Sequence, residues 1–431
     1  MEPRTAPPMH THATLIRRLA GSGAAAFAVA LALRVGAVVG LGHFRQPTLW
    51  ENGVIARYLL DGCGFCMDFS RAGEPSSWQT PAYPLVLAAA WRLLGEGPAA
   101  HLVLSLIQAC ALASMVFPVR WLARRWCGER AGTLAMWLTT VMPLYVWYAT
   151  RLHQAGFVMA AHPWLMWIWL RLRGRATTAR GLLAGAAGGL VGLLQPILLF
   201  LSAAIGAALL AAALAGRRRQ EVTALIIAAL AAVVVVTPWT ARNYQVHGRL
   251  VPIRDSFGKE FWMGNNPQAT GTGYAEGGTI EITYAYPPRA FALKGRVPEI
   301  QLMDALFAEA LAYVRADPVA FAARTAKKIW WFWTMTPAGL VRSTQGGEAL
   351  TFRWLHLGYW LGFLACAAVA LVRGPRVPRE YALILPLYTL TYSVLYGITH
   401  VGQARYRGEM EFIVLPLVAV GLLAALRRGR N

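Results

Sequence analysis

Residues 196–215 read PILLFLSAAIGAALLAAALA, and Arg217, Arg218 and Arg219 follow almost at once. An uncharged apolar helix of this length can cross the roughly 30 Å hydrocarbon core of a bilayer. Arginines clustered just beyond such a segment are typical of a membrane helix that ends on the cytoplasmic side. This stretch therefore predicts an α-helical membrane protein.

The composition of the whole chain agrees with this prediction. Of 431 residues, 57% are hydrophobic and 14% are charged, whereas soluble domains carry roughly 25% charged residues. Such hydrophobicity excludes intrinsic disorder, and five cysteines in this length exclude a small disulfide-rich domain. In a soluble protein the net charge of +21 would suggest nucleic acid. In a membrane protein basic residues fix orientation instead, so we expect no nucleic-acid partner.

Hydropathy predicts an all-α polytopic fold with about ten membrane-spanning helices. The predicted spans are 20–41, 99–122, 131–149, 154–171, 181–195, 196–215, 221–239, 354–372, 381–399 and 409–426. The dipeptide Gln195-Pro196 either kinks one long helix over 181–215 or separates two short ones. Arg34 interrupts the first apolar run, so we expect a retained span and not a cleaved signal peptide.

The arginines sort to one side of these ten spans. Twenty of them precede the first span or follow the second, fourth, sixth, eighth or tenth. The acidic residues on the same side are Glu2, Glu129, Glu221 and Glu380, which leaves +16 of the net +21 there. The positive-inside rule makes this side the cytoplasm and predicts that both termini are cytoplasmic.

Two predicted outer loops are long, and function concentrates in long loops. In the loop 42–98 we expect an amphipathic helix over 50–61 and a second apolar helix that starts at Pro81. The second helix, YPLVLAAAWRLLG, is only 13 residues long, which is too short to span the membrane. We therefore expect it to lie along the interface.

The second long outer loop, 240–353, predicts a small mixed segment. We expect short strands near 249–253 and 258–263, and a helix near 299–316 followed by an aromatic anchor of Trp330, Trp331 and Trp333. The chain is thus expected to divide into an N-terminal transmembrane module (1–239), an extracytoplasmic region (240–353) and C-terminal transmembrane helices (354–431).

Glu51 lies shortly after the first predicted span, where a carboxylate is costly to desolvate without a partner or a task. Such a carboxylate can take a proton from an acceptor hydroxyl, a step worth roughly 10²–10⁴ in rate. The alternative is that Glu51 only places a favourable charge at the N-terminus of the helix over 50–61. The spacing leaves both readings open.

The predicted turn between the last two spans, THVGQARYRGEMEF, carries a cluster of polar residues. These are His400, Arg405, Tyr406, Arg407, Glu409 and Glu411. Arginine forks match phosphate oxygens, and the natural anion beside a bilayer is a lipid phosphate. The alternatives are snorkelling to headgroups and pairing with the glutamates of the turn. Arg242, just after the seventh span, is expected to join the arginines from across the bundle.

Two further motifs have weaker readings. Cys63 and Cys66 form a CxxC that suits a tight disulfide in an oxidising compartment, and no two further ligands for a metal are evident. Asn265 and Asn266 in GNNP are turn residues by default, although amides also bind sugar hydroxyls. The sequence has no P-loop, GxGxxG, HExxH or GxSxG motif, which argues against nucleotide hydrolysis and protease chemistry.

Three passages together resemble the GT-C glycosyltransferases of bacterial membranes, of the dolichyl-phosphate-mannose-protein mannosyltransferase and aminoarabinose-transferase kind. They are LWENGVIARYLLDGCGF…SSWQTPAYPLVLAAAWRLLG (49–95), VVTPWTARNYQVHGRLVPI…FWMGNNPQATGTG (235–273) and THVGQARYRGEMEFIVLPLVAVGLL (399–423). The likeness extends over nearly the whole chain.

This resemblance implies a glycosyltransferase of the bacterial inner membrane with its active site facing the periplasm. The donor would be a polyprenyl-phosphate-linked sugar, and the acceptor a hydroxyl of a lipid, glycan or protein. The family's first-loop catalytic acid maps onto Glu51. Arg405, Arg407 and Tyr406, with Arg242, are then expected to hold the donor phosphate. The expected substrate-binding residues are Gln79, His153, Gln154, Asn265, Asn266, His400 and Glu409.

The chain departs from this family's pattern at two places. Many relatives carry a second acid in the turn after the third span, where this chain has His153 and Gln154. A lysine is common before the Pro-rich helix of the aminoarabinose transferases, where Gln79 and Thr80 stand here. Both differences bear on which sugar and acceptor are used. They also leave open whether a divalent metal takes part, because fewer carboxylates are available to hold one.

Two other functions stay open at this point. A lipid-linked glycan transporter, or flippase, would usually show paired structural repeats, and none is evident in the sequence. A non-catalytic relative that binds a lipid carrier would fit the replacement of the second acid by His153 and Gln154.

Overall fold

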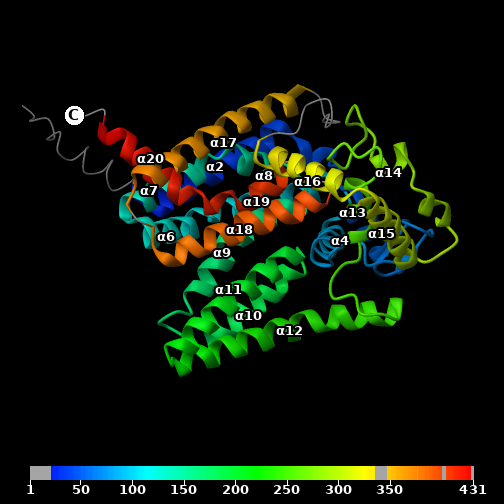
Figure 1. Cartoon of the computed structure of the whole chain (residues 1–431), viewed down its shortest axis with the longest axis horizontal. Coiled ribbons are helices and arrows are strands. Elements are labelled where there is room, and N and C mark those ends of the chain that lie inside the picture. The colour runs from blue at the N-terminus through cyan, green and yellow to red at the C-terminus, as the bar shows by residue number, and fades with distance from the viewer. Residues whose placement is uncertain (1–20, 335–346, 376, 400–403, 429–431) are drawn as a thin grey trace, which may run out of the picture.

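The computed structural model describes residues 21–334, 347–375, 377–399 and 404–428. They form the expected all-α membrane fold, with a bundle of long helices at one end and short elements at the other (Figure 1). The helices that match predicted spans are α2 (Gly23–Leu41), α5 (Pro98–Ser114), α6 (Val116–Cys127), α7 (Glu129–Val141), α8 (Pro143–Ala149), α9 (Gln154–Leu170), α10 (Thr178–Gly192), α11 (Pro196–Ala215), α12 (Arg219–His247), α17 (Gly347–Arg373), α18 (Arg379–Ile398), α19 (Ala404–Met410) and α20 (Leu415–Arg428).

The remaining elements lie in the two long loops. They are α3 (Trp50–Leu60), β1 (Cys66–Met67), β2 (Glu74–Pro75), α4 (Ala82–Leu94), α13 (Phe257–Gly264), α14 (Ile282–Ala285), α15 (Glu299–Ala316) and α16 (Pro318–Trp333). Short 3₁₀ turns occur at His43–Arg45, Arg289–Leu293 and Glu411–Ile413. The helices predicted over 50–61, from Pro81 and over 299–316 are therefore present as α3, α4 and α15.

Six helices among the described residues are long and apolar enough to cross a membrane. They are α2, the continuous pair α5–α6, α11, α12, α17 and α18, and α19–α20 would make a seventh if its bent pair is one span. The segments predicted as the third, fourth and fifth spans form shorter helices, of at most 17 residues each. The chain is a multi-pass membrane protein, and the count of ten crossings stays a prediction.

Proline accounts for the breaks in two predicted spans. The span 131–149 divides into α7 and α8 because Pro143 lacks an amide hydrogen and holds Met142 in an extended conformation, with ψ of 117°. The span 409–426 bends by 64° between Ile413 and Leu415, directly before Pro416. Hydropathy averages over such positions, so the sequence predicted unbroken helices there.

The segment 181–215 forms two helices, α10 and α11, and the contacts around its glycines show how they pack. A Cβ added at Gly188 would meet Ser202, and one at Gly192 would meet Leu199, so α10 and α11 run antiparallel as two helices. On its other side α10 packs against α12, where a Cβ at Gly185 would lie 2.0 Å from the carbonyl oxygen of Ala228. Small residues spaced four apart let the backbones of membrane helices approach this closely.

Hydrogen bonds join the loops into two groups at opposite ends of the bundle. Glu380, at the start of α18, accepts from Arg125 at 2.7 Å and from Arg173 at 3.1 Å, which links three loops predicted on the basic side. At the other end Thr80 Oγ1 donates to the carbonyl of Leu194 at 2.9 Å, which links the first outer loop to the end of the predicted fifth span. This pairing of loops is what the predicted alternation of spans requires.

The prediction of two strands in the second long loop is wrong. Residues 258–263 belong to α13, and residues 249–253 form no strand. Helix α13 buries Phe261 and Trp262 against α15, with the Phe261 and Phe307 rings 5.4 Å apart. This tertiary contact outweighs the local preference of the aromatic residues for a strand. Helix α12 also continues to His247, across the predicted boundary at residue 239.

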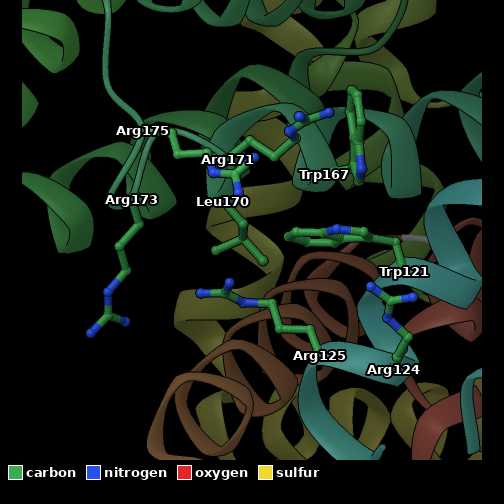
Figure 2. A pocket seen from close by; sticks show the side chains of 8 residues that line it. All are labelled: Trp121, Arg124, Arg125, Trp167, Leu170, Arg171, Arg173 and Arg175. Carbon is green, nitrogen blue, oxygen red and sulfur yellow. The ribbon is translucent and has the colours of Figure 1, made fainter. Parts of the chain in front are cut away.

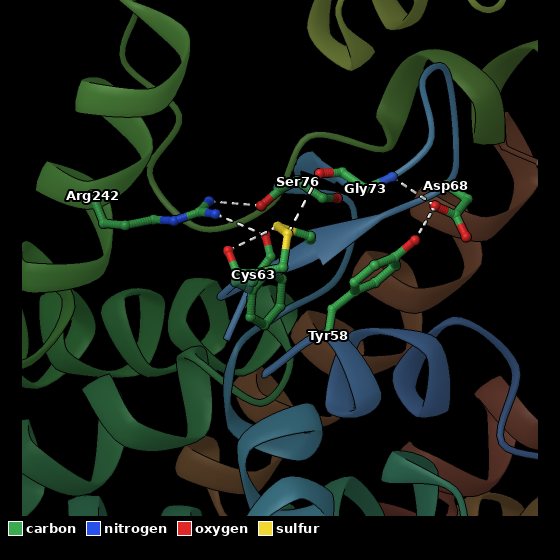
Figure 3. Close-up of a disulfide and its surroundings, with 8 residues drawn as sticks. Tyr58, Cys63, Asp68, Gly73, Ser76 and Arg242 are labelled. Carbon is green, nitrogen blue, oxygen red and sulfur yellow. Dashed lines mark hydrogen bonds between the residues drawn. A yellow bond between two sulfur atoms is a disulfide. The ribbon is translucent and has the colours of Figure 1, made fainter. Parts of the chain in front are cut away.

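The elements of both long loops pack together at one end of the molecule, where Figure 1 shows α4, α13, α14 and α15 side by side. Their shared core includes Ile55, Phe65, Phe69, Trp78, Phe261, Trp262, Met303 and Leu306. Figure 3 shows the Cys63–Cys66 disulfide at the edge of this unit, beside the β1–β2 ribbon. The two loops therefore form one cap on the predicted outer end of the bundle.

Candidate active site

A pocket of about 170 Å³ lies between this cap and the ends of the helices. Seven of the residues predicted for the site line it: Glu51, Gln79, His153, Gln154, Arg405, Tyr406 and Glu409. They come from the first long loop, and from or directly beside the turns between predicted spans three and four and spans nine and ten. Every one of these segments was predicted to be external.

Glu51 stands in the first turn of α3, and an unusual backbone conformation precedes it. Trp50 has φ of +45°, the left-handed region that few residues other than glycine adopt. Its indole packs edge-on against the His153 ring, with centroids 5.4 Å apart. Among the described residues the Glu51 carboxylate has no hydrogen-bonding partner. It thus faces the pocket as an uncommitted charge.

Arg405 is held at the pocket wall by two neighbours. Its Nη1 lies 3.1 Å from His153 Nε2, and its Nη2 donates to the Tyr406 hydroxyl. The backbone amide of Ala155 also points at His153, 2.9 Å from Nδ1, and caps α9. Burial, together with the Arg405 charge, lowers the pKa of His153 well below its usual range. A neutral imidazole has one acceptor nitrogen, so only one of these two donors can be satisfied at a time.

Lys259 is a second cation in the pocket, and the sequence reading did not include it. It is buried, forms an ion pair with Glu281, and lies 4.5 Å from the centroid of the Trp78 ring. Burial alone would lower the pKa of Lys259, but neighbouring carboxylates, Glu281 first and Glu51 among them, raise it overall. Lys259 is therefore charged at neutral pH and acts electrostatically on Glu51.

Other pocket residues also escaped the sequence reading. They are Trp50, Asn52, Trp78, Gln195, Arg254, Glu260, Tyr274 and Glu281. Arg254 and Glu260 pair at 3.8 Å. One signal could have identified Lys259: the chain has only four lysines, and all of them lie in the loop 240–353.

Four amide side chains in the pocket have buried oxygens with no hydrogen-bonding partner among the described residues. They are Asn52 Oδ1, Gln79 Oε1, Gln154 Oε1 and Gln195 Oε1. A buried acceptor left unpaired costs about 1–3 kcal/mol, so each of these amides would be stabilised by a hydrogen-bond donor in the pocket. If these side chains turn their oxygens toward the pocket, the oxygens can accept hydrogen bonds from a polar ligand or from water.

Glu409 belongs to a buried hydrogen-bonded chain at the inner side of the pocket. The Tyr392 hydroxyl donates to Glu409 at 3.0 Å and also lies 2.7 Å from His162 Nε2. All three side chains are buried. The sequence predicted Glu409 as a pocket residue but did not indicate its connection to His162, which lies in a different predicted span.

Arg242 and Arg407 were predicted to hold a phosphate, but they lie outside the pocket. Arg242 donates to the carbonyls of Ser76 (2.6 Å) and Phe65 (2.9 Å) and so ties the first outer loop to α12, as Figure 3 shows. Arg407 is buried and bonds Glu411 at 2.8 Å. Both guanidinium groups are occupied by partners that hold the fold together.

Asn265 and Asn266 also lie away from the pocket, and both are buried. Asn265 donates to the carbonyl of Ile398 at 2.8 Å, and Asn266 donates to that of Trp262 at 2.8 Å. They end α13 and dock it on α18, in agreement with the turn reading. His400 lies outside the described residues.

The described residues contain no group of three or more histidine, cysteine, aspartate or glutamate side chains placed to hold a metal ion. Four carboxylates do line the pocket, namely Glu51, Glu260, Glu281 and Glu409. Glu281 is paired with Lys259, and Glu260 lies beside Arg254. The arrangement suits a ligand with both hydroxyl and anionic parts.

Among solved structures, an oligosaccharyltransferase from Archaeoglobus fulgidus aligns with 94% of this chain at 14% identity and a TM-score of 0.50. This chain has the GT-C fold. The alignment covers 51% of the archaeal protein, so the chain spans about half of that length. The GT-C fold was the one expected from the resemblance of the three sequence passages, and that expectation is confirmed.

Two structures of ArnT from Cupriavidus metallidurans also align with the chain. The form bound to undecaprenyl phosphate matches at 14% identity over 92% of this chain and 76% of ArnT, with a TM-score of 0.40. The apo form matches at 15% identity over 89% and 76%, with a TM-score of 0.36. The sequence matches no protein-family model and no curated protein.

Proposed function

We propose that this protein is a membrane glycosyltransferase. It transfers a sugar from a polyprenyl-phosphate-linked donor to a hydroxyl of a lipid, glycan or protein, at the outer face of the bacterial inner membrane. The observation that carries the proposal is the composition of one pocket: four unpaired amide oxygens, the uncommitted carboxylate of Glu51, and the cations Arg405 and Lys259. Sugar hydroxyls, an acceptor hydroxyl and a phosphate have matching chemistry.

In this proposal the four amides hold the sugar. Asn52 and Gln79 approach from the first outer loop. Gln154 approaches from the start of α9, and Gln195 from the turn between α10 and α11. Each amide oxygen accepts a hydrogen bond from a ring hydroxyl, which removes the cost of leaving it unpaired. A site built this way discriminates strongly against a sugar that lacks one of those hydroxyls.

Glu51 accepts the proton of the acceptor hydroxyl as its oxygen attacks the anomeric carbon of the sugar. The bond between that carbon and the phosphate oxygen breaks, and its electron pair leaves with the lipid phosphate. Arg405 and Lys259 stabilise the charge that grows on this phosphate. Because both cations are already held in place, little reorganisation is needed when the charge develops.

Arg405 keeps its place in the phosphate site predicted from the sequence, and Lys259 is added to it. Arg407 and Arg242 have partners of their own outside the pocket, so we leave them out of the donor site. Tyr406 stays beside Arg405, and its hydroxyl accepts a hydrogen bond from the Arg405 guanidinium. The GT-C fold supports the general class of reaction, and the pocket residues support the division of roles.

The test is sugar transfer in proteoliposomes by the Glu51→Gln variant, with undecaprenyl-phosphate-linked hexoses and pentoses as donors and a bacterial lipid extract as acceptor. We expect transfer to fall by about 10²-fold or more in this variant. Glu96→Gln is the matched control, because Glu96 lies outside the pocket and pairs with Arg57. Full transfer by Glu51→Gln would remove Glu51 from the mechanism, and lipid translocation without transfer would favour a transporter.

A further inference from the structure

A second and larger pocket, of about 470 Å³, lies at the opposite end of the bundle. It opens between the end of α6 and the loop after α9, and both segments were predicted to be cytoplasmic. Figure 2 shows the five arginines of these two segments that line it. They are Arg124, Arg125, Arg171, Arg173 and Arg175, and Trp121, Trp167 and Leu170 complete the lining.

Nearby carboxylates neutralise this pocket only in part. No acidic residue lines it among the described residues. Glu380 pairs with Arg125 and Arg173 from the side, and Glu129 approaches Arg124 at 3.5 Å. Arg171 and Arg175 have no acidic partner in the part of the chain that the structure describes. Five guanidinium groups around one space thus face two carboxylates, an excess of three positive charges.

Tryptophan rings hold two of the arginines in place. The Arg171 guanidinium lies 4.5 Å from the centroid of Trp167, and that of Arg125 lies 5.4 Å from the centroid of Trp121. The two indoles are in edge-to-face contact at 6.5 Å. Stacking on an aromatic face fixes the plane of a guanidinium. The N–H groups of Arg125 are bonded to Glu380, whereas those of Arg171 have no acidic partner among the described residues. The pocket is therefore positively charged and has an aromatic wall formed by Trp121 and Trp167.

The position of this wall indicates what kind of anion fits. Tryptophans gather where membrane helices leave the hydrocarbon, at the depth of the lipid headgroups. Trp121 and Trp167 stand near the ends of α6 and α9, and Leu170 continues the apolar surface. A ligand here meets cations on one side and apolar surface on the other. Basic pockets between membrane helices on the cytoplasmic side are suited to phospholipid headgroups.

We propose that this pocket binds the phosphate of an anionic membrane lipid. Arg171 and Arg175 donate to the phosphate oxygens, and Arg124 adds a third cation. The glycerol and the first carbons of the acyl chains lie against Trp121 and Trp167. The site is separate from the pocket that contains Glu51, and the inference does not depend on the proposed glycosyltransferase activity.

The test compares lipid binding by the purified full-length protein in an uncharged detergent. Thermal stabilisation is measured against increasing dioctanoyl phosphatidylglycerol, dioctanoyl phosphatidylcholine or inorganic phosphate. We expect stabilisation by phosphatidylglycerol alone. In Arg171→Gln/Arg175→Gln the half-maximal concentration should rise about tenfold, because two charge-assisted hydrogen bonds are lost.

The matched control is Arg130→Gln/Arg219→Gln, which removes the same charge from the same side of the protein outside the pocket. This control should change the half-maximal concentration less than about twofold, since distant exposed charges are screened. Equal losses in both double variants would overturn the proposal in favour of diffuse attraction. Stabilisation by inorganic phosphate alone would also overturn it and indicate a soluble ligand. Arg175→Gln alone, with a smaller loss expected, replaces the pocket variant if that variant does not fold.

Discussion

Glu299 gives the cap of this protein a pH dependence that can be calculated from the structure. It accepts hydrogen bonds from Ser76 Oγ (2.6 Å) and the Ser77 amide (2.8 Å), directly before the pocket residues Trp78 and Gln79. Burial raises its pKa from 4.5 to about 7, although both hydrogen bonds act the other way, and the carboxylates of Glu74 and Asp255 add to the increase.

The sign follows from the two states of the chain. Between pH 4.5 and 7 the carboxyl group keeps its proton in the folded cap and loses it in the unfolded chain. The folded state therefore loses stability as the pH rises through this window, and the loss is complete above the folded pKa. A change of 2.5 pKa units corresponds to about 3 kcal/mol, or roughly a three-hundredfold change in local opening.

Glu299→Gln mimics the protonated group and should remove this loss. Amide hydrogen exchange of the Ser76–Gln79 segment, compared between the variant and the wild type at the same pH, cancels the intrinsic exchange rate. We expect no difference at pH 4.5 and up to about three-hundredfold slower exchange in the variant at pH 8. A difference that stays constant with pH, or faster exchange in the variant at pH 8, would refute the reasoning.

Four further predictions concern the site and the packing. Arg405→Gln should lower kcat for sugar transfer by about 10²-fold or more, because a preorganised donor to the leaving phosphate is removed. Arg407→Met leaves the buried Glu411 with His356 as its remaining partner and should lower the free energy of unfolding by at most about 3–5 kcal/mol in chemical denaturation. Gly185→Leu should lower the Tm by driving α10 from α12, whereas Gly36→Leu, with open space around it, should not. Reducing Cys63–Cys66 should cost at most about 2 kcal/mol, because the loop it closes is short.

The sequence predicted the elements of the fold better than their continuity. Hydropathy located every apolar helix, because burial in lipid depends on composition over about 20 residues. It did not locate the break at Pro143 or the 64° bend before Pro416, which single residues impose. The prediction of a strand at 258–263 was wrong for a different reason. The aromatic residues of this segment pack on α15, more than thirty residues further along the chain.

Some residues of the candidate site could also be predicted from the sequence, and others could not. Arg405, His153 and Gln154 could be predicted because they stand at or beside the predicted ends of spans, which the bundle brings together. Glu51 could be predicted because the first-loop passage resembles the GT-C pattern. Lys259 could not be placed, because its position depends on how a loop of more than a hundred residues folds back over the bundle. Arg242 and Arg407 have the residue type expected of a phosphate ligand. Sequence alone cannot tell that backbone carbonyls and Glu411 already occupy them.

The single lone pair of His153 has a consequence for ligand binding. In the empty pocket the Ala155 amide and Arg405 compete for it, so one of them is always left unsatisfied. When an anion takes the Arg405 hydrogens, the imidazole is released to cap α9, and an N-cap is worth about 0.5–2 kcal/mol. Anion binding at Arg405 and the stability of α9 would then be thermodynamically coupled, so that a bound anion stabilises the helix bundle beneath the pocket.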